Sequence, residues 1–330
     1  MKRLWALAFL ALPVAVFFVY EPARIVLRRL WVGPDDYPYS RYLGWFLRNQ
    51  NPDGSWGESV GVLEGHAIGR PGMTGLALLT LLGEGHSHLS KDRIEGRTTG
   101  DAARRGLQWL MRDQLPGGTF GSSNGVVDHA VATLALVEAY GLTGSNLFKN
   151  QAQNAVDALI RLQENAQAFD DVAAQGWALM ALKAAEISGL SFPRVGYDRI
   201  RSYFDARLGE PPGAHEVMSR IFTDKSTEHP RLSIATDRLL AQKPDWSEQD
   251  FASWHWSTLA IFQRDGPNGP KWRAWVPFMH TLARHQGRWG DWPGRNRNET
   301  VIRTSLAAQT LQVYFRYANT SPNLYPPGHE

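Results

Sequence analysis

The sequence predicts an all-α protein of repeated helical hairpins, preceded by one N-terminal transmembrane helix. Three observations carry this prediction. An apolar run opens the chain, a short turn motif recurs after amphipathic helical patterns, and a second helix rich in small residues follows each copy of the motif. Apolar residues make up 43% of the sequence and charged residues 20%, so the chain can bury a substantial core and does not have the composition of a disordered protein.

Residues 1–33 are predicted to be a membrane anchor and an interfacial helix. Two basic residues precede an apolar run from Leu4 to Tyr20, which would span about 25 Å as a helix. A cleaved signal peptide fits this length, but the small residues that a cleavage site requires do not follow the run, which favours an uncleaved anchor.

The next stretch, residues 23–32, sets three arginines and Trp31 among apolar residues, as helices at a bilayer surface do. An ordinary linker helix fits the same pattern equally well. Basic residues lie on both sides of the apolar run and leave the orientation ambiguous. We favour an anchor in the inner or cytoplasmic membrane with the domain on the periplasmic or extracytoplasmic side.

The recurring motif, here called the Gln turn, is a glutamine at a helix end, a glycine-containing turn and then an aromatic residue. Its copies pair Gln50 with Trp56, Gln114 with Phe120, Gln286 with Trp289 and, in a degenerate form, Gln163 with Phe169. The small-residue helices that follow cover 74–85, 129–142, 175–190 and 304–317. Because alanine at i, i+3 and i+4 lets helices approach closely, these helices are expected to form an inner layer.

The middle of the chain reads as helices without the Gln turn, over 197–208, 216–222, 232–242 and 251–262. Pairing all helices from residue 38 to 318 gives five or six units of about fifty residues, enough to close a ring. The repeat domain is therefore placed at 34–318, and the Pro-rich tail, 319–330, is expected to be extended.

The Gln turn resembles the QW motif of the squalene cyclase and protein prenyltransferase repeat family, over roughly residues 38 to 318. The resemblance implies an α-α toroid of five to six helical hairpins. It also implies a structural role for Gln50, Trp56, Gln114, Phe120, Gln286 and Trp289, in which each glutamine caps a helix end and the aromatic residue packs on it.

The catalytic signatures of that family are missing. The cyclases protonate an alkene with an acid held in an Asp-x-Asp-Asp or Asp-Cys-Thr-Ala-Glu motif, and neither motif is present. The prenyltransferases hold zinc with a cysteine, and this chain has none, so that thiolate zinc sites, disulfides and thioesters are excluded as well. The glycine-rich turns lack phosphate-binding patterns, and the sequence predicts no cofactor and no metal site.

Three residues are weak catalytic candidates: Asp128, His129 and Asp171. Helix capping is the favoured alternative for the two aspartates. The expected ligand cavity would be lined by residues at the starts of the inner helices, namely His66, Trp177, Trp254, His255, Trp256, Glu299 and Arg303. Core packing is the favoured role for the triplet 254–256, because adjacent helical residues diverge by about 100°.

The segment 288–299 gathers arginines and tryptophans, the residues that dominate binding hot spots. Its candidate partner-surface residues are Arg288, Trp289, Trp292, Arg295 and Arg297. The alternative is a long repeat loop whose tryptophan belongs to a Gln turn. His86 and His88 have a chelating spacing but no evident third ligand, so a solvated loop is favoured there.

Two functions remain. The first is a non-catalytic, membrane-anchored toroid that serves as an accessory or scaffold subunit of an integral-membrane protein complex, or that binds an apolar or lipid ligand. The second is a terpenoid- or lipid-modifying enzyme with a diverged active site. Nucleic acid is not an expected partner, because the net charge is only +3 and the basic residues are scattered.

Overall fold

The computed structural model describes residues 41–317 except 124, 225–226 and 243. The predicted anchor, interfacial helix and C-terminal tail lie outside the described residues. Within them, the chain forms thirteen helices and two short β-hairpins, which confirms the all-α class. The four helices predicted for the middle of the chain are all present, with ends shifted by at most three residues.

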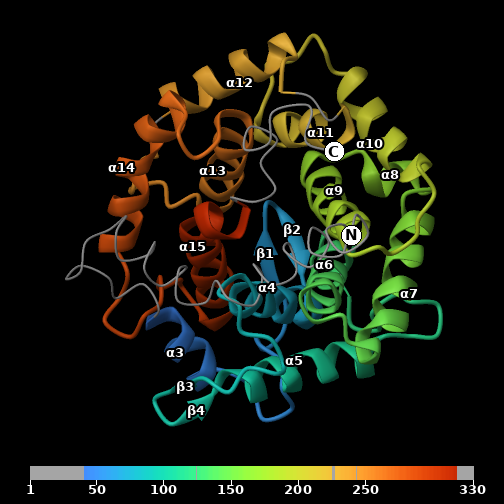
Figure 1. Cartoon of the computed structure of the whole chain (residues 1–330), viewed down its shortest axis with the longest axis vertical. Helices are drawn as coiled ribbons and strands as arrows, with labels where there is room; N and C mark the ends of the chain where they lie inside the picture. Colours follow the sequence, from blue (N-terminus) through green and yellow to red (C-terminus); the bar gives the residue numbers. More distant parts are fainter. Residues whose placement is uncertain (1–40, 124, 225–226, 243, 318–330) are drawn as a thin grey trace, which may run out of the picture. The chain divides into compact units, whose positions relative to one another are not determined.

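Six inner helices contact one another in a closed order, with α4 on α6, then α9, α11, α13 and α15, which returns to α4 (Figure 1). Their bounds are α4 Arg70–Gly83, α6 Val126–Thr143, α9 Val172–Ile187, α11 Ala214–Asp224, α13 Phe251–Asp265 and α15 Arg297–Tyr317. Outside them lie α3 Arg41–Arg48, α5 Thr99–Asp113, α7 Asn146–Leu162, α10 Val195–Asp205, α12 Pro230–Ala241 and α14 Pro270–Arg284, and α8 Ala166–Phe169 is a single turn. Each inner helix thus follows an outer one, as helical hairpins require.

Small residues set the inner-layer spacing, as the alanine pattern predicts. A Cβ atom added at Gly75 of α4 would lie 2.9 Å from the carbonyl oxygen of Val131 on α6, so the two backbones are in near contact. Helix α6 is also the one helix of the described part that is long and apolar enough to span a bilayer, and it is packed among α4, α7 and α9.

Three Gln turns share one geometry. The glutamine amide Nε2 of Gln50, Gln114 and Gln286 donates to the carbonyl oxygen four residues later at 2.8, 3.2 and 2.9 Å. That fourth residue is a glycine with positive φ, at Gly54, Gly118 and Gly290. In each turn a Cβ on this glycine would collide with the backbone of the next outer helix, so the turn binds neighbouring hairpins together.

The aromatic partner of Gln286 is Trp292, not Trp289 as the sequence spacing suggested. Trp292 Nε1 donates to the Leu282 carbonyl oxygen at 3.0 Å, as Trp56 Nε1 donates to that of Phe46 at 2.9 Å. The side chain of Trp292 is 1% exposed and that of Trp289 is 59% exposed. The spacing from glutamine to aromatic residue is therefore six in all these turns, because the turn itself has a fixed length.

Substitution of Gly118 tests this turn. We expect Gly118→Ala to lower the free energy of unfolding by about 2 to 4 kcal/mol, because the residue has φ 85° and its Cβ would meet the Asn154 carbonyl. The adjacent Gly117 has open space around it, so Gly117→Ala should change stability by less than about 0.5 kcal/mol. Urea unfolding of both variants compares their stabilities, and equal unfolding midpoints would show that the close approach at Gly118 does not contribute to stability.

Candidate functional site

A β-hairpin carries one acidic side chain into the middle of the inner helices. Strands β1 Gly61–Leu63 and β2 His66–Ile68 pair antiparallel, with Leu63 opposite His66. The two residues between them, Glu64 and Gly65, have φ 51° and 82°, as a type I′ turn requires. Asparagine is the usual first residue of such a turn, so glutamate is held here in an unfavourable left-handed conformation.

Three ring nitrogens surround the Glu64 carboxylate. Its Oε2 accepts hydrogen bonds from Trp177 Nε1 at 2.8 Å and Trp256 Nε1 at 3.1 Å. His215 Nε2 lies 3.2 Å from Oε1, within ion-pair distance but without the alignment of a good hydrogen bond. The side chains of Glu64 and His215 are 14% and 13% exposed. Oε2 is therefore fully used, whereas Oε1 retains acceptor capacity.

The pKa of Glu64 reflects a balance of opposing effects. Burial alone would raise it, but the neighbouring His215 and the two indole N–H groups hold the pKa below its ordinary value. The carboxylate is thus ionised at neutral pH although its side chain is largely buried. Such a group interacts strongly with any donor or positive charge that reaches it.

A pocket of about 370 Å³ opens beside this carboxylate. Its walls come from the hairpin, the start of α11, the end of α12 and the start of α13. Polar and apolar side chains share the lining about equally, and the polar ones are Glu64, His215, Arg238, Gln242, Asp250, Ser253 and Ser257. The ring of Trp256 forms part of the apolar wall and makes an edge contact with Trp177 at a centroid distance of 5.2 Å.

A buried ion-pair network fixes the first turn of α11, which carries His215. Glu216 Oε1 accepts from Arg220 Nε at 2.8 Å and from Arg231 Nε at 2.6 Å, and its Oε2 accepts from Arg231 Nη2 at 2.8 Å. Glu216 and Arg220 are both buried. Since Arg231 belongs to α12, the network joins the two helices that flank the pocket.

Four of the residues predicted to line a cavity do gather around the hairpin. Trp177 and Trp256 contact Glu64 directly, and His255 stacks on Trp177 with ring centroids 6.3 Å apart. His66 Nε2, on the hairpin itself, lies 2.9 Å from Asp171 Oδ1.

The other three lie elsewhere. Trp254 points away from Trp256 and packs on Phe278, with ring centroids 5.4 Å apart. Glu299 and Arg303 form an ion pair of 2.9 Å near the start of α15, and Arg303 also donates to the Pro293 carbonyl oxygen at 2.9 Å. These two residues brace the loop before α15.

The aspartates considered as catalytic candidates both cap helices. Asp171 caps its own helix, α9, by accepting from the Ala174 amide at 2.9 Å. Asp128 caps the neighbouring α4, where its two oxygens accept from the amides of Gly69 at 2.9 Å and Gly72 at 2.5 Å. His129 is buried, and its Nε2 lies 3.1 Å from the Ala155 carbonyl oxygen. These contacts give all three residues structural roles.

The buried histidines make stability depend on pH. Burial lowers the pKa of His129 to about 4 and that of His255 to about 3, below the usual 6.5. Between pH 6.5 and 4 the unfolded chain therefore binds protons that the folded chain does not, and stability must fall as the pH falls. The change for His129 alone is about 3 kcal/mol. Urea unfolding at pH 7 and pH 4.5 should show this loss, and a smaller loss in a His129→Gln variant. An unchanged midpoint would contradict it.

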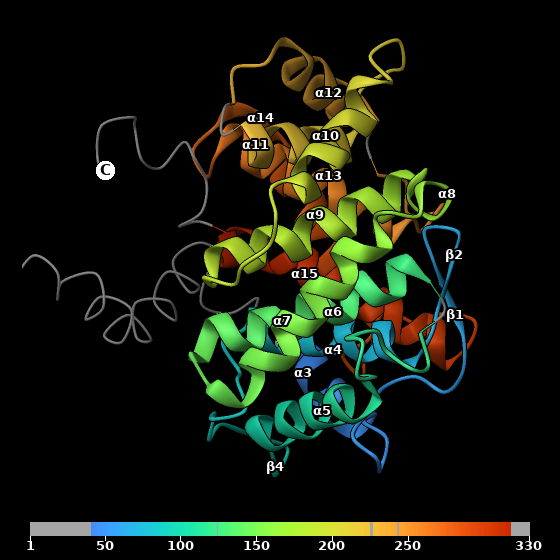
Figure 2. The ribbon, with the colours of Figure 1, turned by 90° about the vertical axis from the view of Figure 1, so that its right-hand side faces the viewer.

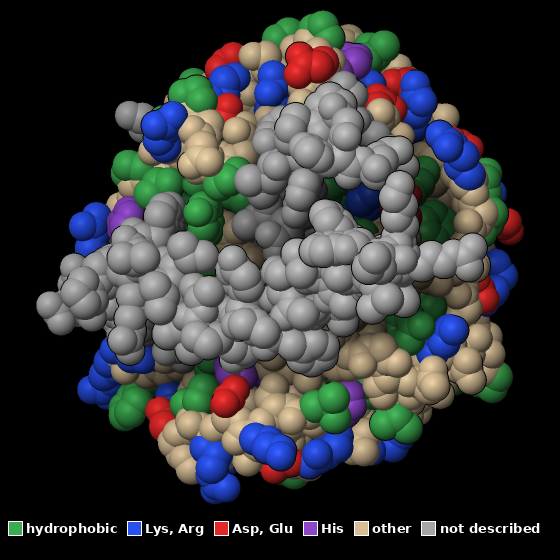
Figure 3. Space-filling model, viewed as in Figure 1, with side chains coloured by type: hydrophobic (Ala, Val, Ile, Leu, Met, Phe, Trp, Pro, Cys, Tyr) green, Lys and Arg blue, Asp and Glu red, His purple; other side chains and the backbone are tan. Residues whose placement is uncertain are grey.

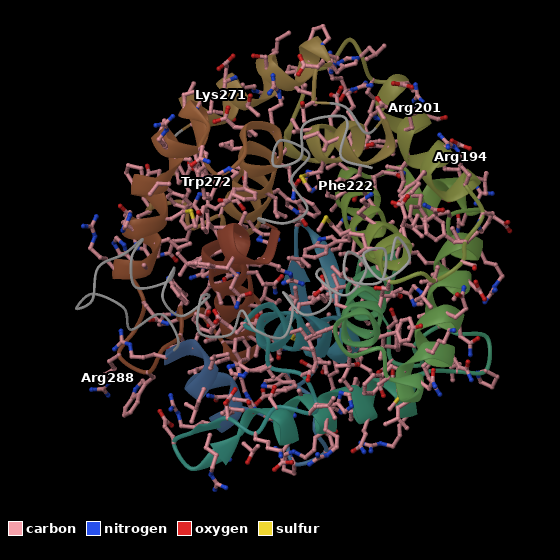
Figure 4. The ribbon with its side chains drawn as sticks, viewed as in Figure 1. Arg194, Arg201, Phe222, Lys271, Trp272 and Arg288 are labelled. Carbon is pink, nitrogen blue, oxygen red and sulfur yellow. The ribbon has the colours of Figure 1, made fainter. Side chains whose placement is uncertain are left out.

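The proposed partner loop is largely committed to contacts within the domain. Trp292 is buried. Arg297 Nη2 donates to the Asn49 carbonyl oxygen at 2.9 Å and to Asn51 Oδ1 at 2.8 Å, and these bonds join the last helical hairpin to the first. Arg288 lies over the ring of Trp289 at 4.7 Å, and both are exposed, as is Arg295. Only these three of the five candidates are available to a partner. Figure 4 shows Arg288 at the outer edge of the domain.

Among the residues that the structure describes, no three His, Asp or Glu side chains are arranged to hold a metal ion. His86 Nδ1 lies 3.2 Å from Asp92 Oδ2, whereas His88 is buried edge-on against Phe148. The two histidines of this pair therefore face different surroundings.

The central residues of the site, Glu64 and His215, were missed in the sequence. The stretch Val60 to Gly69 alternates apolar residues around Glu-Gly, which is a weak hairpin pattern, but no pattern links it to His215.

Comparison with known proteins gives the fold alone. No family model and no curated protein matches the chain. Among solved structures, a protein from Actinoplanes matches with a TM-score of 0.52 and 17% sequence identity, over 84% of this chain and 98% of its own. The alignment extends over nearly the whole neighbour, so the two proteins share an arrangement of helices.

Proposed function

We propose that this chain is a non-catalytic, membrane-tethered α-α toroid that binds a small polar ligand in the pocket beside Glu64. The closed order of six inner helices supports the toroid. The apolar run Leu4–Tyr20 supports the tether, to an inner membrane with the domain on its extracytoplasmic side. The binding role rests on one observation, the ionised Glu64 carboxylate held at the edge of an open pocket.

The chemistry of the pocket defines the ligand. An ionised carboxylate only accepts hydrogen bonds. Because both indole N–H groups bond to Glu64 Oε2, its Oε1 has acceptor capacity left, and the ligand presents an N–H, O–H or positive group there. The polar side chains among the pocket walls favour a hydroxylated or amino compound over the purely apolar ligand expected from the sequence. The accessory role in a membrane complex remains part of the proposal, with Arg288, Trp289 and Arg295 as its exposed candidate contacts.

Calorimetric titration of the full chain in mild detergent with glucosamine, glucose and glucuronate tests the ligand class. The three probes share a pyranose ring and differ in charge. We expect glucosamine to bind most tightly and glucuronate least, with the difference lost in a Glu64→Gln variant. Preferential binding of glucuronate, or an unchanged order in Glu64→Gln, would contradict the proposal.

A second candidate is general acid–base catalysis by Glu64 and His215, which the 3.2 Å separation between their side chains favours. In that case the probe compounds would be turned over, and His215→Asn would abolish turnover with little change in binding. Product analysis by NMR spectroscopy after incubation separates the two candidates, because acid–base catalysis on a single sugar gives an isomer of the same mass, whereas a binding module returns the probes unchanged.

A further inference from the structure

Arg238 brings a free positive charge to the wall of the Glu64 pocket. It lies in the last turn of α12 and is exposed, and within the described part of the chain its guanidinium makes no ion pair and no side-chain hydrogen bond. The other charged residues of α12 are engaged elsewhere. Arg231 belongs to the network that joins α11 to α12, and Asp237 pairs with Lys271 at 2.7 Å. The N–H donors of Arg238 are therefore available to a ligand.

Glu64 and Arg238 belong to different walls of the pocket and are not paired with each other. Glu64 lies in the turn of the β1–β2 hairpin, and its ion-pair partner is His215. Arg238 comes from α12. Figure 2 shows the hairpin at one end of the inner helices. Since both charges line one pocket without meeting, each can contact a separate group of the same bound molecule.

The surrounding helices hold the two charges in place. Arg231 lies about two turns before Arg238 on α12 and bonds to both carboxylate oxygens of Glu216 on α11. Leu239, the residue after Arg238, is buried, and α12 packs on both α11 and α13. Charged groups that are fixed before binding lose little conformational freedom when a ligand arrives.

The charges of the pocket favour a ligand that carries both signs. Glu64 and Asp250 are acidic, whereas Arg238 is basic and His215 is already paired with Glu64. Asp250 Oδ1 accepts from the Ser253 amide at 3.0 Å at the start of α13, where the helix dipole stabilises a negative charge. A ligand with only an anion would be repelled by two carboxylates, and a ligand with only a cation would leave Arg238 without a partner.

We propose that Arg238 is a second anchor of the ligand, which carries an ammonium group for Glu64 and an oxyanion, either a carboxylate or a phosphate, for Arg238. This rests on the binding pocket of the proposed function and narrows its ligand to a zwitterion. A guanidinium can bind such an oxyanion through two parallel N–H···O bonds, which an ammonium cannot do. Glucuronate, with an anion but no ammonium, is still expected to bind poorly.

Amino sugars with and without an acidic group at the sixth carbon test the oxyanion. Glucosamine, 2-amino-2-deoxyglucuronate and glucosamine 6-phosphate share one ring and one amino group, and the last two add a carboxylate or a phosphate. In calorimetric titration of the full chain in mild detergent, we expect at least one acidic probe to bind about tenfold more tightly than glucosamine. The probe that gains more identifies the oxyanion. In the Arg238→Gln variant this gain should fall below about twofold, while glucosamine binds as before.

Arg273→Gln is the matched control, because it removes the same charge from an exposed arginine that does not line the pocket. Arg273 belongs to α14, whose residues Lys271 and Trp272 are labelled in Figure 4. Basic and acidic side chains are interspersed around the rim of the face shown in Figure 3, so the loss of one charge changes the overall field little. We expect the acidic probe to keep its full gain in this variant.

Three results would overturn the role of Arg238. They are no gain for either acidic probe, a gain that survives in Arg238→Gln, and an equal loss in Arg273→Gln, which would show a general effect of charge. Loss of glucosamine binding in Arg238→Gln would also contradict it, because the residue would then support the pocket instead of binding the oxyanion. Failure of the pocket proposal itself is distinguishable, since the wild type would then show no preference for glucosamine over glucose.

Discussion

Replacing Glu64 with asparagine is expected to lower the free energy of unfolding by about 2 to 4 kcal/mol and to remove ligand binding. Asparagine suits the first position of a type I′ turn better than glutamate does, so the turn itself should become more stable. The loss comes from the site. The shorter neutral side chain cannot reach Trp177 Nε1 and Trp256 Nε1, which would be left buried without an acceptor.

The second hairpin provides a matched control. Strands β3 Arg93–Ile94 and β4 Arg97–Thr98 are joined by Glu95 and Gly96, with φ 50° and 79°, so the same residue pair makes the same turn. Glu95 is exposed and pairs with Arg48 at the surface. We expect Glu95→Asn to change stability by less than about 0.5 kcal/mol. Urea unfolding of both variants is decisive, and equal effects would show that Glu64 serves only as a turn residue.

The largest effect on stability is expected from Trp292→Ala, which should cost about 3 to 5 kcal/mol. Trp292 is 1% exposed, and its backbone amide donates to Thr304 Oγ1 at 3.1 Å, as that of Trp56 donates to Thr74 at 3.0 Å. Its removal leaves a cavity in the last helical hairpin, α14–α15, which packs against the first helical hairpin, α3–α4.

Trp289→Ala is the control for this prediction, since its ring is mostly exposed and lies only three residues away. We expect it to cost less than about 0.5 kcal/mol. Thermal unfolding of the two variants compares them directly. A larger effect of Trp289→Ala would reverse the assignment of the aromatic position.

The helices could be predicted from the sequence because hydrophobic period and small-residue spacing are local properties. The inner helices α4, α6, α9 and α15 were all expected from alanine- or glycine-rich patterns. The exact aromatic partner of Gln286 was not, since two tryptophans follow within six residues and the difference between them is one of burial.

The site was harder to predict because it is assembled from distant segments. Trp177 and Trp256 were expected near a cavity. The residue that joins them is Glu64, which precedes both by more than a hundred residues and lies in a β-hairpin whose strands are three residues long. Asp128 illustrates the opposite difficulty. Its place before a histidine at a helix start suggested chemistry, but its oxygens cap a helix that is separated from it by more than fifty residues.

Mass spectrometry of small molecules carried by the full chain tests the central claim most directly. The protein would be purified from its own membranes in mild detergent, in wild-type and Glu64→Gln forms, and its bound compounds released and identified. The account predicts a stoichiometric amino or hydroxyl compound in the wild type and its loss from Glu64→Gln. No bound compound in the wild type, or equal amounts of one in both forms, would contradict it.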